Sequence, residues 1–177
     1  VVDECFNDFL TDAERHTRKD LLESNPGLII LRAYTKMYAV PGVRFGWCMT
    51  ADAALIEKLY HAGQPWNVSV IAQACAAAAA NEPDWAAETA KRIAEERRFL
   101  SDGLAACGLT VFPGEANFLL FCSNDTGLHE KLAEHGIMIR NCDNYRGLSA
   151  GYYRVAVKTR EASKCLLNAI KLIIENG

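Results

Sequence analysis

The sequence predicts an α/β fold followed by a small α+β domain, and three observations indicate this organisation. Residues 28–31 form a continuous apolar run between turn signals, which is typical of a strand buried on both faces of a parallel sheet. Residues 51–106 carry helical patterns almost without interruption. Beyond Gly108, short apolar segments alternate with helical ones. We therefore expect a mostly parallel sheet with helices in residues 1–95 and a compact α+β domain in residues 96–177.

The first part of the chain begins with a predicted strand at residues 1–2, which ends in a polar tip at Asp3. Residues 11–25 are charged and loop-like, with some helical potential near their end. After the apolar run described above, Pro41-Gly42 interrupts the chain, because proline and glycine favour turns. Residues 43–49 then predict a further short strand.

Three helices are predicted next. Residues 51–62 form the first, with Thr50 as its N-terminal cap. Residues 69–80 are apolar nearly all round, which indicates a buried helix. Residues 83–106 are long and amphipathic, and Gly108 is a suitable residue to end that helix. The charged residues 95–98, in the middle of this helix, are interpreted as a solvated face.

The second part predicts four short strands and two helices. The strands are expected at residues 109–112, 116–122, 137–140 and 152–157, and the helices at residues 126–135 and 160–175.

Composition excludes several classes of protein. Of the 177 residues, 50% are apolar and 23% are charged, which is typical of a globular protein with a sizeable core. The formal charge of -3 favours neither a nucleic-acid partner nor an anionic membrane surface. No apolar run approaches the roughly 20 residues that span a bilayer. We expect no metal site, because the four histidines lie in charged or helical surface contexts.

The seven cysteines are scattered, odd in number and never spaced as C-x-x-C. A disulfide scaffold or a zinc module would cluster them, so reduced thiols and a cytoplasmic location are expected. The chain also opens on a strand, without methionine. Because a buried strand is an unusual place for a protein to begin, we expect a fragment whose N-terminal half is absent.

Three residues near strand ends are candidates for chemistry: Asp3, Lys36 and Arg44. Ligands of parallel α/β sheets bind at one edge of the sheet, where strands end. Taken singly, Lys36 is interpreted as a surface lysine and Asp3 as a helix cap or turn residue. The functional interpretation of Lys36 rests on the whole stretch from Thr35 to Gly46, which reads T-K-x-Y-A-x-P-G-x-R-x-G. That of Asp3 rests on its position at a strand tip, roughly thirty residues before the lysine.

That stretch, together with Asp-Glu at the strand tip, resembles fold-type-I pyridoxal-phosphate (PLP) enzymes of aminotransferase class I/II. The resemblance covers the whole chain and implies that residues 1–95 are part of the large, PLP-binding domain. The second half most resembles threonine-phosphate decarboxylases of cobalamin biosynthesis, close relatives of histidinol-phosphate aminotransferases. The segments that carry this likeness are residues 114–118, 139–148 and 152–157.

The resemblance implies a role for each candidate at the cofactor. Lys36 matches the lysine that binds PLP as an imine and, once released, moves a proton at the reacting carbon. Asp3 matches the carboxylate that favours the protonated ring nitrogen. Arg44 matches the ligand of the cofactor phosphate, and Thr35 adds a hydroxyl there. One departure is Phe6, where many aminotransferases have a tyrosine that hydrogen-bonds the cofactor ring.

The resemblance also implies substrate ligands. Arg154 and Arg140 match arginines that bind the substrate's carboxylate or phosphate, and Asn117 matches the substrate-side wall. From the residues alone, a strand arginine can equally be an exposed edge charge, and the asparagine can simply satisfy backbone groups. Two arginines around one substrate fit a ligand with more than one anionic group.

The function implied first is decarboxylation of O-phosphothreonine by a lyase of cobalamin biosynthesis. The alternative is a histidinol-phosphate-type aminotransferase, a transferase that uses the same site. A further alternative is the PLP-sensing domain of a transcription regulator. The resemblance implies a homodimer for the full-length protein, and we expect the 177-residue chain alone to be inactive.

Overall fold

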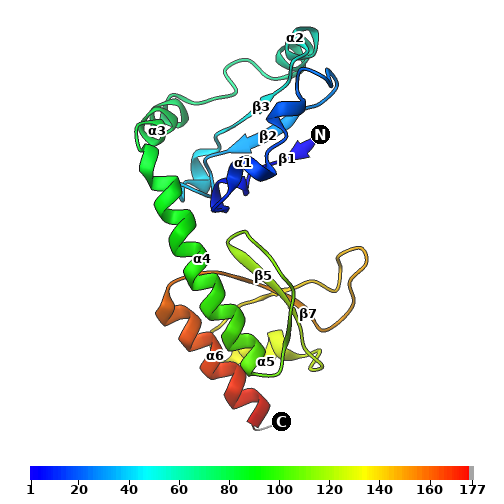
Figure 1. The fold of residues 1–177 in the computed structure, drawn as a ribbon, viewed down its shortest axis with the longest axis vertical. Helices are drawn as coiled ribbons and strands as arrows, with labels where there is room; N and C mark the ends of the chain where they lie inside the picture. The colour runs from blue at the N-terminus through cyan, green and yellow to red at the C-terminus, as the bar shows by residue number, and fades with distance from the viewer. Residues whose placement is uncertain (176–177) are drawn as a thin grey trace. The chain divides into compact units, whose positions relative to one another are not determined.

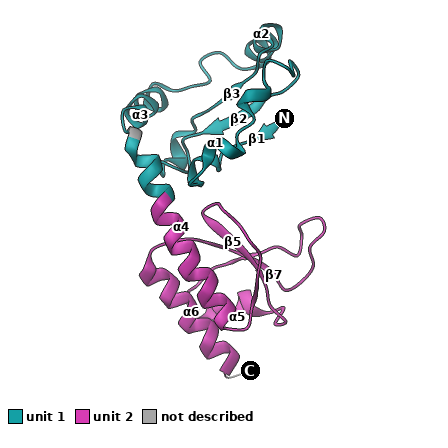
Figure 2. Ribbon diagram, viewed as in Figure 1, with its two compact units in different colours: residues 1–90 teal, residues 91–177 magenta. Residues whose placement is uncertain are grey.

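The computed structural model describes residues 1–175, apart from the side chain of Pro83. The chain forms two compact units, Val1–Ala90 and Lys91–Gly177 (Figure 2). The boundary lies within helix α4 (Pro83–Ala106). The domain division expected between residues 95 and 96 falls in the same helix and stays a prediction.

Ahead of α4, the described part of unit 1 contains three short strands, three short 3-10 helices and three α-helices (Figure 1). In chain order these are β1 (Val2–Asp3), η1 (Asn7–Phe9), α1 (Ala13–His16), η2 (Lys19–Leu21), β2 (Ile30–Ala33), η3 (Pro41–Val43), β3 (Gly46–Met49), α2 (Ala53–Ala62) and α3 (Val70–Ala80).

The sheet of unit 1 has the order β1-β2-β3 and is mixed. Strands β1 and β2 are parallel, with Asp3 opposite Leu31. Strands β2 and β3 are antiparallel, with Ala33 opposite Gly46. A mostly parallel sheet was expected, and one of the two pairings described has that direction. The other is antiparallel because the loop between β2 and β3 contains no crossover helix that would return the chain in the parallel sense.

Two expectations for the helices of unit 1 are wrong. Helix α2 is capped by Asp52, whose carboxylate accepts the backbone N–H of Leu55 at 3.1 Å, and not by Thr50. Helix α3 was expected to be buried, yet among the described residues only its Ala72 is. Val70 and Ile71 are 81% and 70% exposed. An apolar composition does not bury a helix unless another surface covers it.

Unit 2 contains an antiparallel sheet and two helices after α4. The elements are β4 (Thr110–Val111), β5 (Phe118–Cys122), α5 (Leu128–Glu134), β6 (Arg140–Asn141), β7 (Tyr152–Ala156) and α6 (Arg160–Glu175). The sheet order is β4-β5-β7-β6, and all three pairings are antiparallel. The α+β character expected of this part is confirmed, although the strands are shorter than predicted. Of the strand expected at residues 137–140, only Arg140 lies in a strand, because β6 begins there.

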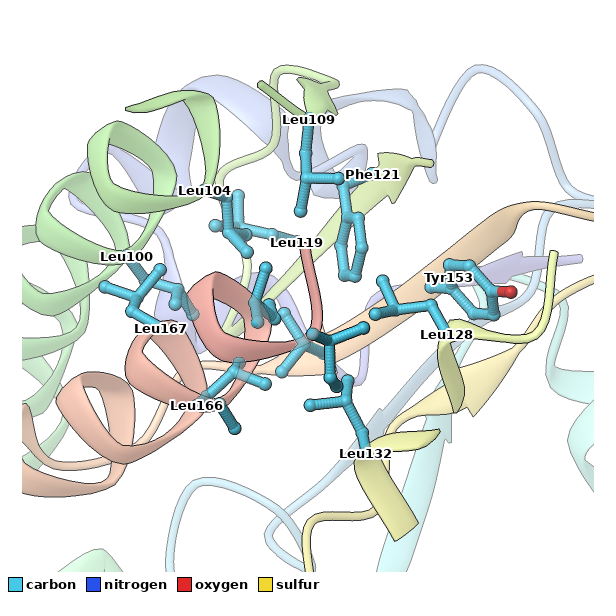
Figure 3. Packing of buried hydrophobic residues seen from close by; sticks show 14 of the residues in the cluster. Leu100, Leu104, Leu109, Leu119, Phe121, Leu128, Leu132, Tyr153, Leu166 and Leu167 are labelled. Carbon is cyan, nitrogen blue, oxygen red and sulfur yellow. The ribbon is translucent and has the colours of Figure 1, made fainter. Parts of the chain in front are cut away.

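The core of unit 2 lies between the helices and one face of the sheet. Figure 3 shows Leu104 of α4, Phe121 of β5 and Tyr153 of β7 packed together, and all three are fully buried. The Tyr153 hydroxyl keeps hydrogen bonds to the backbone carbonyls of residues 125 and 126. Gly108 has a φ of 78°, a left-handed conformation that ends α4 and turns the chain toward the sheet.

The structure tests the expectations for the cysteines and for the histidines. All seven cysteines are free thiols. His129 is not solvated as expected, because its Nδ1 is buried and its ring lies 5.7 Å from that of Tyr153. Within the described residues no group of three or more His, Cys, Asp or Glu could hold a metal ion. None of the helices described is long and apolar enough to cross a membrane.

Candidate functional site

Asp3 lies at the end of β1, with its side chain exposed. The backbone N–H of Cys5 donates to its Oδ1 at 2.9 Å. The pKa of Asp3 is lowered, first by a hydrogen bond from the Cys5 side chain, then by that N–H, with a smaller contribution from the charge of Lys36. Asp3 is therefore an accessible carboxylate that stays ionised at neutral pH.

Lys36 lies in the loop that follows β2, and its side chain is exposed. Its Nζ lies 4.9 Å from the centre of the Phe6 ring, a cation–π distance. Because Phe6 follows Asp3 by three residues and Asp3 senses the charge of Lys36, the structure brings Asp3, Phe6 and Lys36 together. Phe6, the position at which the resemblance implies a tyrosine, places its ring against the Lys36 amine.

The loop that carries Lys36 is fixed by hydrogen bonds and by aromatic packing. The N–H of Tyr38 donates to the carbonyl of Tyr34 at 3.1 Å, and the N–H of Val40 donates to that of Thr35 at 3.1 Å. The Tyr34 ring lies edge-on to Trp47, with 4.7 Å between ring centres. These contacts hold the backbone of the loop and leave the Lys36 amine free to reach a ligand.

A further tether lies beside the lysine. Met37 is only 3% exposed, and its carbonyl accepts the indole N–H of Trp85 at 3.1 Å. Trp85 belongs to the first turns of α4, which are part of unit 1. The residue next to Lys36 is thus anchored by a side chain distant in sequence.

Arg44 follows the turn at Pro41 and is exposed, with a left-handed backbone (φ 60°). Its Nη1 donates to the Pro41 carbonyl at 2.7 Å, which leaves most of the five guanidinium donors available. Gly46 allows the close approach of β3 to β2, because a Cβ there would lie 3.0 Å from the Arg32 carbonyl oxygen. Within residues 1–175, no hydrogen bond or ion pair joins the side chain of Arg44 or Thr35 to Asp3 or Lys36.

The predicted substrate ligands lie in unit 2, on the face of the sheet opposite its core. Arg140 of β6 and Arg154 of β7 are direct cross-strand partners. The Arg154 guanidinium lies 5.0 Å from the centre of the Phe118 ring. The Arg140 guanidinium lies 5.7 Å from the Tyr145 ring, and its Nη2 donates to Asn144 at 3.4 Å. The structure therefore brings the two arginines together.

Like charges on directly opposite residues of adjacent strands destabilise a sheet. Among the residues that the structure describes, neither arginine forms an ion pair with a carboxylate. An anionic ligand would relieve this repulsion. Asn117 lies just before β5, and its backbone carbonyl accepts the N–H of Val157 at 2.8 Å, while its side chain makes no hydrogen bond inside the described chain.

Sequence reasoning missed Arg97. Its Nη1 donates to the carbonyls of Glu115 and Ala116, at 2.7 and 3.1 Å, directly ahead of Asn117. Burial lowers its pKa from the ordinary arginine value. The neighbouring Glu96 binds both nitrogens of the Arg160 fork, at 2.8 and 2.9 Å. The solvated helix face expected here is therefore wrong for these two residues, and no local pattern marks their distant partners.

Replacing Arg97 by methionine is expected to lower the free energy of unfolding of the chain by about 1 kcal/mol, because two carbonyls lose their donor. Urea unfolding followed by circular dichroism measures this difference. Arg98→Met is the matched control, since Arg98 is exposed and has the same charge. Equal effects of the two substitutions would show that the Arg97 hydrogen bonds contribute nothing.

Comparison with known proteins places these features in context. The family model described as aminotransferase class I and II matches residues 1–170. The threonine-phosphate decarboxylase of Salmonella typhimurium is 34% identical over 177 residues, which cover 98% of this chain and 48% of the relative. A histidinol-phosphate aminotransferase of Nitratidesulfovibrio vulgaris is 31% identical over 179 residues, covering 100% of this chain and 47% of the relative.

Solved structures agree with these relatives. The crystal structure of histidinol-phosphate aminotransferase from Clostridium acetobutylicum matches with a TM-score of 0.93 and 29% identity, over 99% of this chain and 54% of that one. The α/β fold expected from the sequence is confirmed by this match. The chain spans about half the length of the curated relatives it matches.

Proposed function

This chain belongs to the aminotransferase class I and II family, and from that premise we propose that the full-length protein decarboxylates O-phosphothreonine with PLP as its cofactor. The observation that carries the proposal is the cross-strand pair of Arg140 and Arg154. Two guanidinium groups on adjacent strands suit a substrate with two anionic groups, a carboxylate and a phosphate. The likeness to the Salmonella decarboxylase supports the same substrate class.

Enzymes of this family depend on PLP, and the residues of unit 1 fit that cofactor. Asp3 is an ionised, accessible carboxylate, which suits contact with a protonated ring nitrogen. Lys36 offers an exposed amine in a fixed loop close to Asp3. Arg44 and Thr35 supply donors for the phosphate group. When bound, PLP accepts the electron pair of the bond that breaks at the substrate's α-carbon.

In this proposal Lys36 has two tasks. It would hold the cofactor, and its amine would supply a proton at the substrate's α-carbon. Asp3 keeps the ring nitrogen charged throughout. Arg140 and Arg154 would bind two anionic groups of the substrate.

A histidinol-phosphate-type aminotransferase is the second candidate, and the match to the Clostridium structure favours it. One assay on the full-length protein separates the two. We expect release of carbon dioxide from O-phosphothreonine and no amino transfer to 2-oxoglutarate. Transfer from histidinol phosphate without any release of carbon dioxide would overturn the decarboxylase proposal in favour of the aminotransferase.

Arg154→Met in the full-length protein is expected to lower kcat/KM for the phosphorylated substrate. Loss of one charge-assisted hydrogen-bond partner costs about 1.5–3 kcal/mol, which corresponds to about a 10- to 100-fold decrease. Arg140→Met should have an effect of similar size, and the double variant should lose less than the sum, because both arginines share one ligand. Arg98→Met is the control with no expected change. Unchanged kinetics in both single variants would remove the arginines from the site.

Three further properties of the whole protein are proposed with the function. The full-length protein is a homodimer, its location is cytoplasmic, and residues 1–177 alone have no turnover. Light scattering of the full-length protein tests the homodimer. An assay of the isolated chain with added PLP tests its lack of turnover. Measurable turnover by the isolated chain would contradict the last.

A further inference from the structure

A cluster of charged side chains lies inside unit 1, formed by Glu4, Asp8 and Arg32. Arg32 Nη1 binds Glu4 Oε2 at 3.1 Å, and Arg32 Nη2 binds Asp8 Oδ1 at 2.9 Å. Side-chain exposure is 16% for Arg32, 4% for Glu4 and 21% for Asp8. None of these residues has a role in the proposed chemistry.

The cluster joins the two segments that carry the candidate cofactor ligands. Glu4 follows Asp3 directly in the chain, and its backbone N–H donates to the Leu31 carbonyl at 2.9 Å. Arg32 is the next residue of β2, the strand that leads into the loop of Lys36. Arg32 therefore connects the tip of β1 with the start of that loop, a few residues from Asp3 on one side and from Lys36 on the other.

The Glu4 carboxylate is held from several directions. Its Oε1 accepts the backbone N–H of Arg18 at 2.8 Å, and its Oε2 accepts the hydroxyl of Thr17 at 2.9 Å. Arg32 completes this set and extends it to Asp8. A planar guanidinium can divide its fork between two carboxylates, whereas a lysine ammonium is a single point charge.

Stability alone is a weak reason for such a cluster. Removing charges from water costs free energy that their attraction often only offsets, so apolar residues of similar size can replace a buried pair without loss. Burial raises the pKa of Asp8, and the charge of Arg32 opposes that rise. Apolar residues would not reproduce directed hydrogen bonds, such as the one by which Arg32 of β2 binds Glu4 at the tip of β1.

We infer that Arg32 is a positioning residue that holds Asp3 and Lys36 at the spacing the cofactor requires. The inference rests on the proposed function, since it concerns the residues that would bind PLP. Arg32 touches neither the cofactor nor the substrate in this account. It acts through Glu4 on the β1 tip and through β2 on the lysine loop.

The test compares the full-length wild-type protein with Arg32→Met and Arg32→Lys. Arg18→Met is the matched control, because within residues 1–175 the hydrogen bonds of the Arg18 guanidinium go to the carbonyls of residues 15 and 17 and to no carboxylate. Two quantities are measured at a temperature where circular dichroism shows every variant folded. They are the absorption maximum of the lysine-linked cofactor and the rate at which PLP is lost to an excess of a carbonyl-trapping reagent.

Arg32→Met is expected to lose PLP about tenfold faster than wild type and to shift the absorption of the lysine-linked form, because Asp3 and Lys36 no longer keep their spacing. Arg32→Lys should also lose PLP faster, since the ammonium cannot serve both carboxylates. If Arg32→Met does not fold, Arg32→Lys carries the comparison. Arg18→Met should match wild type.

A lower melting temperature of the Arg32 variants, with absorption and rate of PLP loss equal to wild type, would overturn the inference and leave Arg32 a structural residue. An equal acceleration in Arg18→Met would overturn it too, because the effect would then be one of net charge. Absence of lysine-linked absorption in the wild-type protein would instead overturn the proposed function, and the inference with it.

Discussion

Replacing Lys36 by alanine in the full-length protein is expected to abolish the visible absorption of the lysine-linked cofactor. Turnover should fall by about 10²–10⁴-fold or more, because the same amine would also deliver the proton at the α-carbon. The structure supports this large effect by the position of Lys36. Its Nζ lies over Phe6 and close to Asp3, in a loop whose backbone is fixed on both sides.

The control for this variant is Lys19→Ala. Lys19 belongs to the same unit, and its ammonium pairs with Glu14 at 3.4 Å on the surface. Loss of its charge should change neither absorption nor turnover. A lysine-linked band that persists in Lys36→Ala would mean that another amine binds the cofactor.

Asp3→Asn is expected to have the next largest effect, because it removes the charge proposed to keep the cofactor ring nitrogen protonated and changes little else. A hydrogen bond to a charged group contributes about 1.5–3 kcal/mol, so kcat should fall about 10- to 100-fold. The asparagine oxygen can still accept the N–H of Cys5, as Asp3 does at 2.9 Å. The fold of the β1 tip should therefore survive the substitution.

A second readout of Asp3→Asn needs no cofactor. Burial, followed by the hydrogen bond to Asp3 and the charge of Asp3, raises the pKa of Cys5 to about 11. Removing that charge lowers the pKa of Cys5, so more of the thiol is ionised at pH 8 and alkylation is faster. Peptide mapping after limited alkylation isolates this cysteine from the other six. An unchanged rate at Cys5 would contradict the geometry described for Asp3.

The sequence could predict which candidate residues lie close together where neighbouring strands carry them. Asp3 is the last residue of β1 and Lys36 follows β2, and these two strands are neighbours in one sheet. Arg140 and Arg154 were expected on consecutive strands, and those strands pair directly. In both cases short-range patterns locate the strands, and the pairing of neighbouring strands supplies the contact.

Other features depend on partners that no local pattern identifies. Arg97 and Arg32 bind groups distant in sequence, the Ala116 carbonyl and the Glu4 carboxylate, at 3.1 Å each. Such contacts arise from tertiary packing and leave no periodic signal. The exposure of α3 was missed for a related reason, since apolar content predicts a preference for burial and not the surface that provides it.

Lys36 is the residue proposed to be joined to the cofactor, and chemical trapping of that link would identify the residue. The full-length protein is loaded with PLP, reduced with borohydride to fix the link, digested and analysed by mass spectrometry. We expect the reduced cofactor on the peptide that contains Lys36, and on no other lysine. Cofactor fixed to a different lysine, or none fixed at all, would contradict it.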